Sequence, residues 1–137
     1  MEQSIEVPAD WESIATLMAF TDSAETCMPV SEPQSFLMRL VIEEIATNIV
    51  KYGYDDQAHG VIKLTCIHED GVLRVVIRDH GKPFDPRDPP DPDLDADVEN
   101  RSVGGLGIFL VREFADEITY SHDPASGWNE LIVTKGQ

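Results

Sequence analysis

Two stretches of alternating residues meet at Asp70-Gly71, and this junction constrains the fold more than any other part of the sequence. The stretches 61–69 and 72–79 are rich in β-branched residues, and an Asp-Gly pair between such stretches is typical of a tight β-hairpin. We therefore expect two paired antiparallel strands. Alternation in the second strand puts four side chains on one face: Leu73, Val75, Ile77 and Asp79.

The residues before the hairpin predict one short strand and two helices. We expect an edge strand at residues 4–8 and a helix at residues 11–26. The start of the second helix is clearer, because Ser31 and Gln34 stand at capping-box spacing. Gly53 should end this helix.

The chain changes character between residues 80 and 103, where prolines and aspartates exclude regular structure. We expect a long mobile loop there. The glycine-rich turn at residues 104–107 should then open a helix, followed by strands at residues 117–121 and 129–135. Four side chains of that helix are expected to face the core: Leu106, Phe109, Leu110 and Phe114.

This order of elements predicts an α/β (α+β) two-layer sandwich, in which helices cover one face of a mainly antiparallel sheet. With 137 residues, the chain should form a single domain, residues 1–137. Neither a membrane span nor a signal peptide is evident, so we expect a cytoplasmic protein without membrane contact. Cys27 and Cys66 lack the spacing of a metal or redox site, and we expect both to be buried, reduced thiols.

The formal charge of -16 bears on the partners of the chain. Direct nucleic-acid binding is disfavoured, because it needs a basic surface. A nucleotide bound to so acidic a protein needs a cation to offset the repulsion between negative charges. We therefore expect Mg²⁺ to accompany any nucleotide.

Glu44 and Asn48 lie one turn apart on an otherwise apolar stripe of the second helix. Burying these groups without partners would cost on the order of 1–3 kcal/mol each, and a polar pocket avoids that cost. In such a pocket the carboxylate could accept the proton of an attacking hydroxyl, and the amide oxygen could ligate Mg²⁺. The simpler interpretation is a helix edge with both side chains in solvent.

Asp79 ends the apolar row of its strand, and Gly81 follows two residues later. A carboxylate at the mouth of an apolar slot could accept a hydrogen bond from the exocyclic amine of adenine. The glycine would let the backbone approach the ring. Taken alone, this pair is weak evidence, because Asp and Gly are ordinary turn residues.

The turn Gly104-Gly105-Leu106-Gly107 precedes a helix, whose free amide groups suit phosphate oxygens. A flexible hinge would have the same composition. P-loop and Rossmann glycine motifs are absent from the sequence.

Together and in this order, these three signals resemble the N, G1 and G2 boxes of the GHKL (Bergerat-fold) ATPase superfamily. The stretches RLVIEEIATNIVKYGY, RDHGKPFDP and GGLGIFLVREFAD are similar to the anti-sigma-factor serine/threonine kinases of bacterial partner-switching systems. The resemblance covers the chain from about residue 31 to its end. Pro83 and Trp128 depart from the superfamily, which has a second G1 glycine and a small hydroxyl residue at these two positions.

The resemblance implies a role for each box. Glu44 would be the general base, Asn48 the Mg²⁺ ligand, and Asp79 the reader of adenine. The turn at residues 104–107 would contact the phosphates, and residues 80–103 would form the ATP lid. Two basic residues are the nearest further candidates for phosphate contacts: Lys51 and Arg101.

The implied function is that of an ATP-dependent serine/threonine protein kinase that is also an anti-sigma factor. Such a protein phosphorylates a small STAS-domain anti-sigma-factor antagonist and sequesters a sigma factor, commonly as a homodimer. One alternative is a non-catalytic ATP-binding module, although such a module has no use for a base at position 44. Another is an acidic scaffold that binds no nucleotide.

Overall fold

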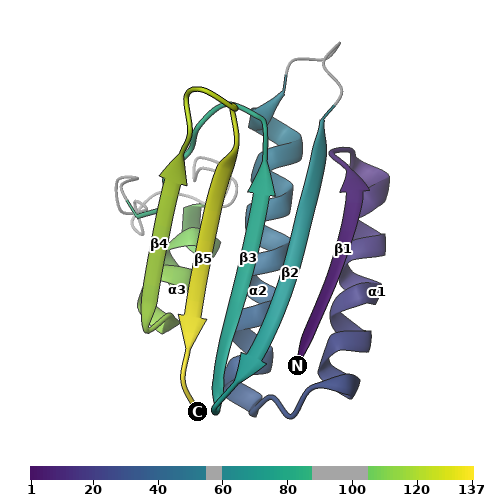
Figure 1. Cartoon of the computed structure of the whole chain (residues 1–137), viewed down its shortest axis with the longest axis vertical. Coiled ribbons are helices and arrows are strands. Elements are labelled where there is room, and N and C mark those ends of the chain that lie inside the picture. The colour runs from purple at the N-terminus through teal and green to yellow at the C-terminus, as the bar shows by residue number, and fades with distance from the viewer. Residues whose placement is uncertain (55–59, 88–104) are drawn as a thin grey trace.

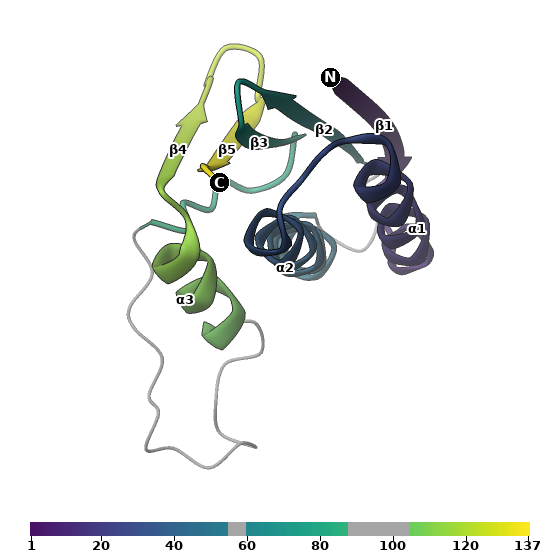
Figure 2. The same cartoon turned by 90° about the horizontal axis from the view of Figure 1, so that it is seen from below.

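The computed structural model of the chain describes residues 1–54, 60–87 and 105–137. Five strands form one antiparallel sheet in the order β1-β2-β3-β5-β4. Figure 1 shows the sheet in front of the helices, and Figure 2 shows all three α-helices on one side of it. The predicted two-layer α+β sandwich is therefore confirmed. The elements are β1 (Glu2–Pro8), α1 (Trp11–Cys27), α2 (Glu32–Asn48), the π-helical turn η1 (Ile49–Gly53), β2 (Val61–Glu69), β3 (Val72–Asp79), α3 (Gly105–Phe114), β4 (Glu117–His122) and β5 (Asn129–Lys135).

The β2–β3 hairpin forms as predicted. Asp70 and Gly71 have φ values of 54° and 79°, and a two-residue type I′ turn needs positive φ at both positions. The helix-facing side chains of both strands lie in one apolar layer, in which Cys66 pairs with Val75. The predicted alternation in β3 is confirmed, because every second side chain from Leu73 to Asp79 is buried.

The start of α2 is tied to the sheet by one buried side chain. Ser31 and Gln34 form the predicted capping box. The side chain of Gln34 also donates from Nε2 to the carbonyl of Gly71, at 2.8 Å, and to that of Lys135, at 3.0 Å. The residue that caps the helix therefore also holds the helix against the ends of two strands.

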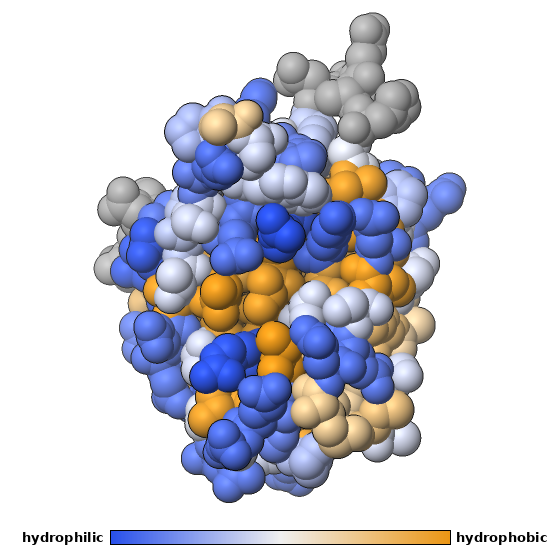
Figure 3. Space-filling view, in the orientation of Figure 1, coloured by the Kyte–Doolittle hydropathy of each residue, from blue (hydrophilic) through white to orange (hydrophobic). Residues whose placement is uncertain are grey.

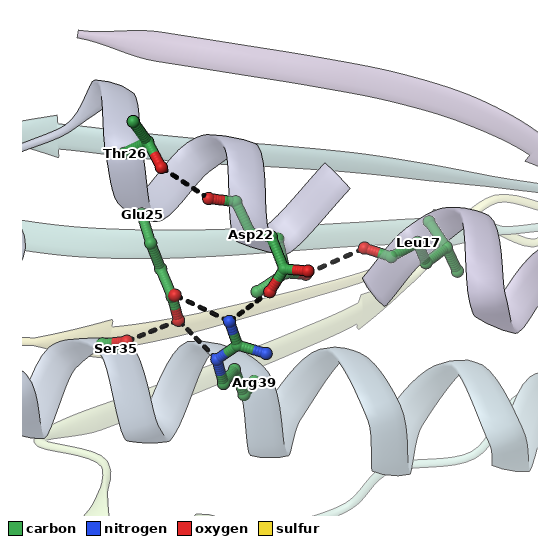
Figure 4. Close-up of polar contacts among 7 residues, drawn as sticks. Leu17, Asp22, Glu25, Thr26, Ser35 and Arg39 are labelled. Carbon is green, nitrogen blue, oxygen red and sulfur yellow. Dashed lines mark hydrogen bonds and ion pairs between the residues drawn. The ribbon is translucent and has the colours of Figure 1, made fainter. Parts of the chain in front are cut away.

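Arg39 joins α2 to α1. Its guanidinium forms ion pairs with Asp22 and Glu25 of α1, and the bond from Nη2 to Glu25 Oε2 is 2.7 Å long. Ser35 also donates a hydrogen bond to Glu25 (Figure 4). These contacts hold the pKa of the Glu25 carboxyl below its usual range, chiefly through the hydrogen bond from Arg39.

Two predictions about burial are wrong. Leu106 and Phe114 are exposed, whereas Ile108 and Val111 of α3 enter the core. The bulk of Leu106 and Phe114 suggested that their side of α3 faces the core. The side of α3 that packs against α2 instead carries the small residue Gly107. Cys27 is also exposed, because α1 ends there with its last turn at the surface.

Other predictions agree with the structure or lie outside it. Cys66 is a buried, free thiol, and burial raises its pKa to about 12. Most of the predicted loop and lid at residues 80–103 lies outside the described residues, which stop at 87 and resume at 105. Within the described ranges, no helix is both long and apolar enough to cross a membrane.

Candidate functional site

One end of the sheet gathers residues from three separate segments. Asp79, the last residue of β3, pairs with Asn129, the first residue of β5. The end of η1 reaches the same place, because a Cβ atom on Gly53 would lie 3.8 Å from the Gly81 Cα and 3.9 Å from Asp79 Oδ2. The predicted G1 residues are thus adjacent to the end of the helix that carries Glu44 and Asn48.

Asp79 is a buried carboxylate with few donors around it. Only 6% of its surface is exposed. The backbone N–H of Gly81 donates to Oδ2 at 2.8 Å, and Asn129 Nδ2 lies 3.4 Å from each carboxylate oxygen. Burial raises the pKa of Asp79, and the bonds from Gly81 and Asn129 oppose this rise. A carboxylate has about four acceptor sites, so these two donors leave room for a further hydrogen bond from the exocyclic amine of a nucleotide base such as adenine.

Gly81 is required by the packing of the chain itself. A Cβ atom there would come within 2.7 Å of the Gly53 carbonyl oxygen. The N–H of Lys82 donates to that same oxygen at 2.7 Å, so the segment after Asp79 is tied to the end of η1. The close approach of a nucleotide ring to Gly81 stays a prediction, because Gly53 already explains the glycine.

Glu44 and Asn48 are half-buried on α2, one turn apart. A Cβ atom on Gly107 would come within 2.0 Å of the Glu44 carboxyl carbon, so Glu44 lies directly against the first turn of α3. The fold therefore brings the candidate base to the glycine-rich turn. The pKa of Glu44 is raised by burial and, to a smaller degree, by the neighbouring charge of Glu43.

The π-helical turn η1 begins directly after Asn48. Single π-helical turns are rare and are frequently found at functional sites. Mg²⁺ in nucleotide sites usually takes one or two protein oxygens and fills its remaining positions with phosphate and water oxygens. The side-chain oxygen of Asn48, which is half-buried, is a metal ligand of the type that such a site uses.

Other predicted residues are less closely placed. Lys51 is exposed, and its ammonium lies 5.5 Å from the centre of the Tyr52 ring. Gly105 is the first residue of α3, and Leu106 is exposed beside it. Arg101 and Gly104 lie outside the described residues.

A sequence profile decides the family of the chain. The profile of the histidine kinase-like ATPase domain matches residues 7–135, which contain strands β2 to β5 and the end of β1. The chain belongs to the histidine kinase-like ATPase family.

Curated relatives of this ATPase domain carry related names. The chain is 32% identical to the anti-sigma F factor of Priestia megaterium over 82 residues, which are 59% of this chain and 56% of that protein. It is 28% identical to the serine/threonine-protein kinase BtrW of Bordetella bronchiseptica, over 72% of this chain and 68% of that protein. It is 26% identical to the serine-protein kinase RsbW of Bacillus cereus, over 87% of this chain and 76% of that protein. With the first relative, the match spans less than two thirds of that protein's length.

The ATPase domain also contains site residues that sequence reasoning missed. Asn129 is 4% exposed and contacts Asp79, and its side-chain oxygen accepts from Tyr120 and His122. The stretch at residues 127–131 resembles the closing strand motif of the anti-sigma-factor kinases, but that resemblance assigned no role to Asn129. Only the pairing of β3 with β5 places it beside Asp79.

Proposed function

We propose that this chain is an ATP-dependent serine/threonine protein kinase and an anti-sigma factor of a bacterial partner-switching system. It acts in the cytoplasm. Its substrate is a small STAS-domain anti-sigma-factor antagonist, and its sequestered partner is a sigma factor.

The contact between Glu44 and Gly107 carries this proposal. A domain that only binds ATP needs groups that contact the adenine ring, the phosphates and the metal. It gains nothing from a carboxylate at the phosphate-binding turn, where two negative groups repel each other. A kinase needs a base there, and the raised pKa of Glu44 brings it closer to that of an effective general base near neutral pH.

The site residues divide the work as follows. Asp79 accepts the hydrogen bond of the adenine amine, and Asn48 supplies an oxygen to Mg²⁺, which neutralises phosphate charge in such sites. Glu44 accepts the proton of the substrate hydroxyl while that oxygen forms a bond to the γ-phosphorus. The bond from the γ-phosphorus to the leaving oxygen breaks, and ADP leaves. The turn at residues 104–107, together with Lys51 and Arg101, contacts the phosphates.

The names of the relatives support the two activities. One is an anti-sigma factor, and two are serine or serine/threonine protein kinases. Phosphorylation adds about -1.5 to -2 charges to the antagonist. A chain with a net charge of -16 then repels its product, which frees it to bind the sigma factor.

The deciding experiment combines the protein with Mg-ATP and the small antagonist proteins of its own genome, followed by intact-mass measurement. A kinase adds one phosphate to a serine or threonine of one antagonist. Sequestration of a sigma factor without phosphate transfer would favour the non-catalytic binding module instead. A protein that binds no nucleotide would favour the acidic scaffold.

Two variants separate chemistry from binding. Glu44→Gln keeps the size and hydrogen bonding of the side chain but cannot take a proton, so transfer should fall roughly 10²- to 10⁴-fold while ATP and antagonist still bind. Asn48→Ala should weaken Mg²⁺-dependent ATP binding as well. Undiminished transfer by Glu44→Gln would show that this carboxylate is not the base.

A third variant tests the base-reading role. Asp79→Asn should weaken ATP binding, because an amide accepts hydrogen bonds less strongly than a carboxylate does. Its stability should not fall, since the change removes a buried charge whose pKa burial raises. Unchanged ATP affinity in calorimetry would place adenine elsewhere.

We further propose that the protein is a homodimer that pairs through the open face of its sheet. Figure 3 looks onto this face, where apolar side chains cross the centre; Val76 pairs with Ile132 there. The same face carries three basic residues (Lys63, Arg74 and Arg78) and five acidic ones (Glu2, Glu6, Glu69, Glu117 and Glu130), whereas the chain has 10 basic and 26 acidic residues in all. This face therefore opposes the approach of a second acidic copy less than the rest of the surface does.

Light scattering tests the dimer directly. Ile132→Glu places a charge in the apolar centre of the open face and should yield a monomer. Thr16→Glu adds the same charge to the exposed surface of α1 and is the matched control. A wild-type monomer, or an Ile132→Glu dimer, would refute this arrangement.

A further inference from the structure

A hydrogen-bond cluster centred on the buried side chain of Asn129 lies beside Asp79 and has no part in the roles assigned above. Asn129 Nδ2 donates to the Gly81 carbonyl at 2.9 Å and faces both oxygens of Asp79 at 3.4 Å. On its other side, Asn129 Oδ1 lies 3.2 Å from the Tyr120 hydroxyl and 2.7 Å from His122 Nδ1. The cluster links β4, β5 and the end of β3.

The chemistry of these partners orients the amide of Asn129. The Gly81 carbonyl and the Asp79 carboxylate can only accept, so the NH₂ group must face them. The amide oxygen then faces Tyr120, whose hydroxyl donates to it. It follows that His122 carries a proton on Nδ1 and donates as well.

This orientation controls what Asp79 presents to a ligand. In the described part of the chain, Asp79 receives side-chain hydrogen bonding from Asn129 and a backbone bond from Gly81. Burial raises the pKa of Asp79, and the Asn129 amide opposes that rise by stabilising the ionised form. An ionised carboxylate is purely an acceptor, whereas a protonated one can donate.

That difference distinguishes two classes of purine. A 6-amino purine donates to the carboxylate, while a 6-oxo purine offers a carbonyl oxygen, which an ionised carboxylate repels. A carboxyl group that is protonated, or free to turn, loses this discrimination. A binding site rejects the wrong ligand most strongly when that ligand leaves a buried polar group of the site without a hydrogen bond.

We propose that Asn129, oriented by Tyr120 and His122, is a positioning residue that sets the preference for 6-amino over 6-oxo purine nucleotides. This inference rests on the proposed function, because it assumes that Asp79 meets the base. It gives a role to the strand that follows Trp128, where the chain departs from the superfamily motif.

Calorimetry with Mg-ATP and Mg-GTP on the full chain tests the inference. Asn129→Ala should lower the affinity for ATP about tenfold and leave that for GTP unchanged or higher, so that the ratio of the two falls about tenfold or more. Asn129→Thr, whose hydroxyl can donate, should restore part of the ratio. Glu130→Gln is the matched control, because it alters the next residue of β5, on the opposite face.

The orientation claim has its own variant. Tyr120→Phe combined with His122→Phe keeps Asn129 but removes the two groups that donate hydrogen bonds to its side-chain oxygen. This double variant should lower the ratio of ATP affinity to GTP affinity, but less than Asn129→Ala does. An unchanged ratio in this double variant would overturn the orienting role of Tyr120 and His122.

The results separate the inference from the function on which it rests. Urea unfolding of each variant shows whether the fold is intact, and a ratio of affinities is insensitive to a small unfolded fraction. A wild type that prefers ATP, with the same preference in Asn129→Ala, would overturn the inference alone. A wild type that binds neither nucleotide would overturn the proposed function and the inference with it.

Discussion

Glu44 on α2 lies so close to Gly107 on α3 that a Cβ atom at position 107 would come within 2.0 Å of its carboxyl carbon. The two residues are far apart in the sequence, and no single motif contains both. Their contact brings the carboxylate to the first turn of a helix, where backbone amides favour negative groups. The same turn suits phosphate groups, so the candidate general base lies next to the candidate phosphate site.

Gly107→Ala should separate these two residues. The added methyl group must displace the Glu44 carboxylate, and a misplacement of about 1 Å can cost on the order of 10²-fold in rate. Stability should change by less than about 1 kcal/mol, because alanine favours the helix and a glutamate side chain can turn away. Single-turnover phosphate transfer and urea unfolding check this. Glu113→Ala, an exposed change in the same helix, is the control, and undiminished transfer in Gly107→Ala would count against the shared site.

The rate of transfer should fall at acid pH with a midpoint above that of an ordinary glutamate. Glu44 acts as a base only when ionised, and burial raises its pKa, so activity is present above this pKa and lost as the pH falls through it. Rates at saturating Mg-ATP between about pH 5 and pH 8 report the midpoint. Glu43→Gln removes the nearby like charge and should move the midpoint to lower pH. An identical profile in Glu44→Gln would mean that another group titrates.

Removing the Gln34 side chain should destabilise the fold without touching the site. Gln34→Ala leaves the carbonyls of Gly71 and Lys135 without their donor, at a cost of about 1–3 kcal/mol. Gln34→Glu keeps an acceptor for the Ser31 N–H but loses both donors, so it should be destabilised too. Urea unfolding measures both variants. Wild-type stability in Gln34→Glu would show that the donors contribute nothing.

The ion pairs of Arg39 should stabilise the protein only modestly. Arg39→Lys keeps the charge but loses the planar fork that meets Glu25, and we expect a loss of about 0.5–1 kcal/mol. The difference from wild type should shrink in high salt, because these side chains are partly exposed. Unfolding curves at low and high salt measure it; a loss that is independent of salt would point to packing instead of charge.

Local features were predictable because their causes lie within a few residues. The capping box depends on residues three apart, and the hairpin on two turn residues between alternating strands, so both matched the structure. The inner face of α3 was not predictable in this way. Bulk pointed to Leu106, but the neighbour across the interface is Glu44, which needs the space left by Gly107.

The elements, their order, the alternation that ends at Asp79 and the Glu44–Asn48 pair could all be predicted from the amino-acid sequence. These follow from helix and strand periodicities and from the residues that stop them. The contacts of Asn129 with Asp79 and of Glu44 with Gly107 could not be predicted in this way. The physical reason is that both contacts depend on how β3 pairs with β5 and on how α3 packs against α2, and each of these is settled by the burial of a whole face.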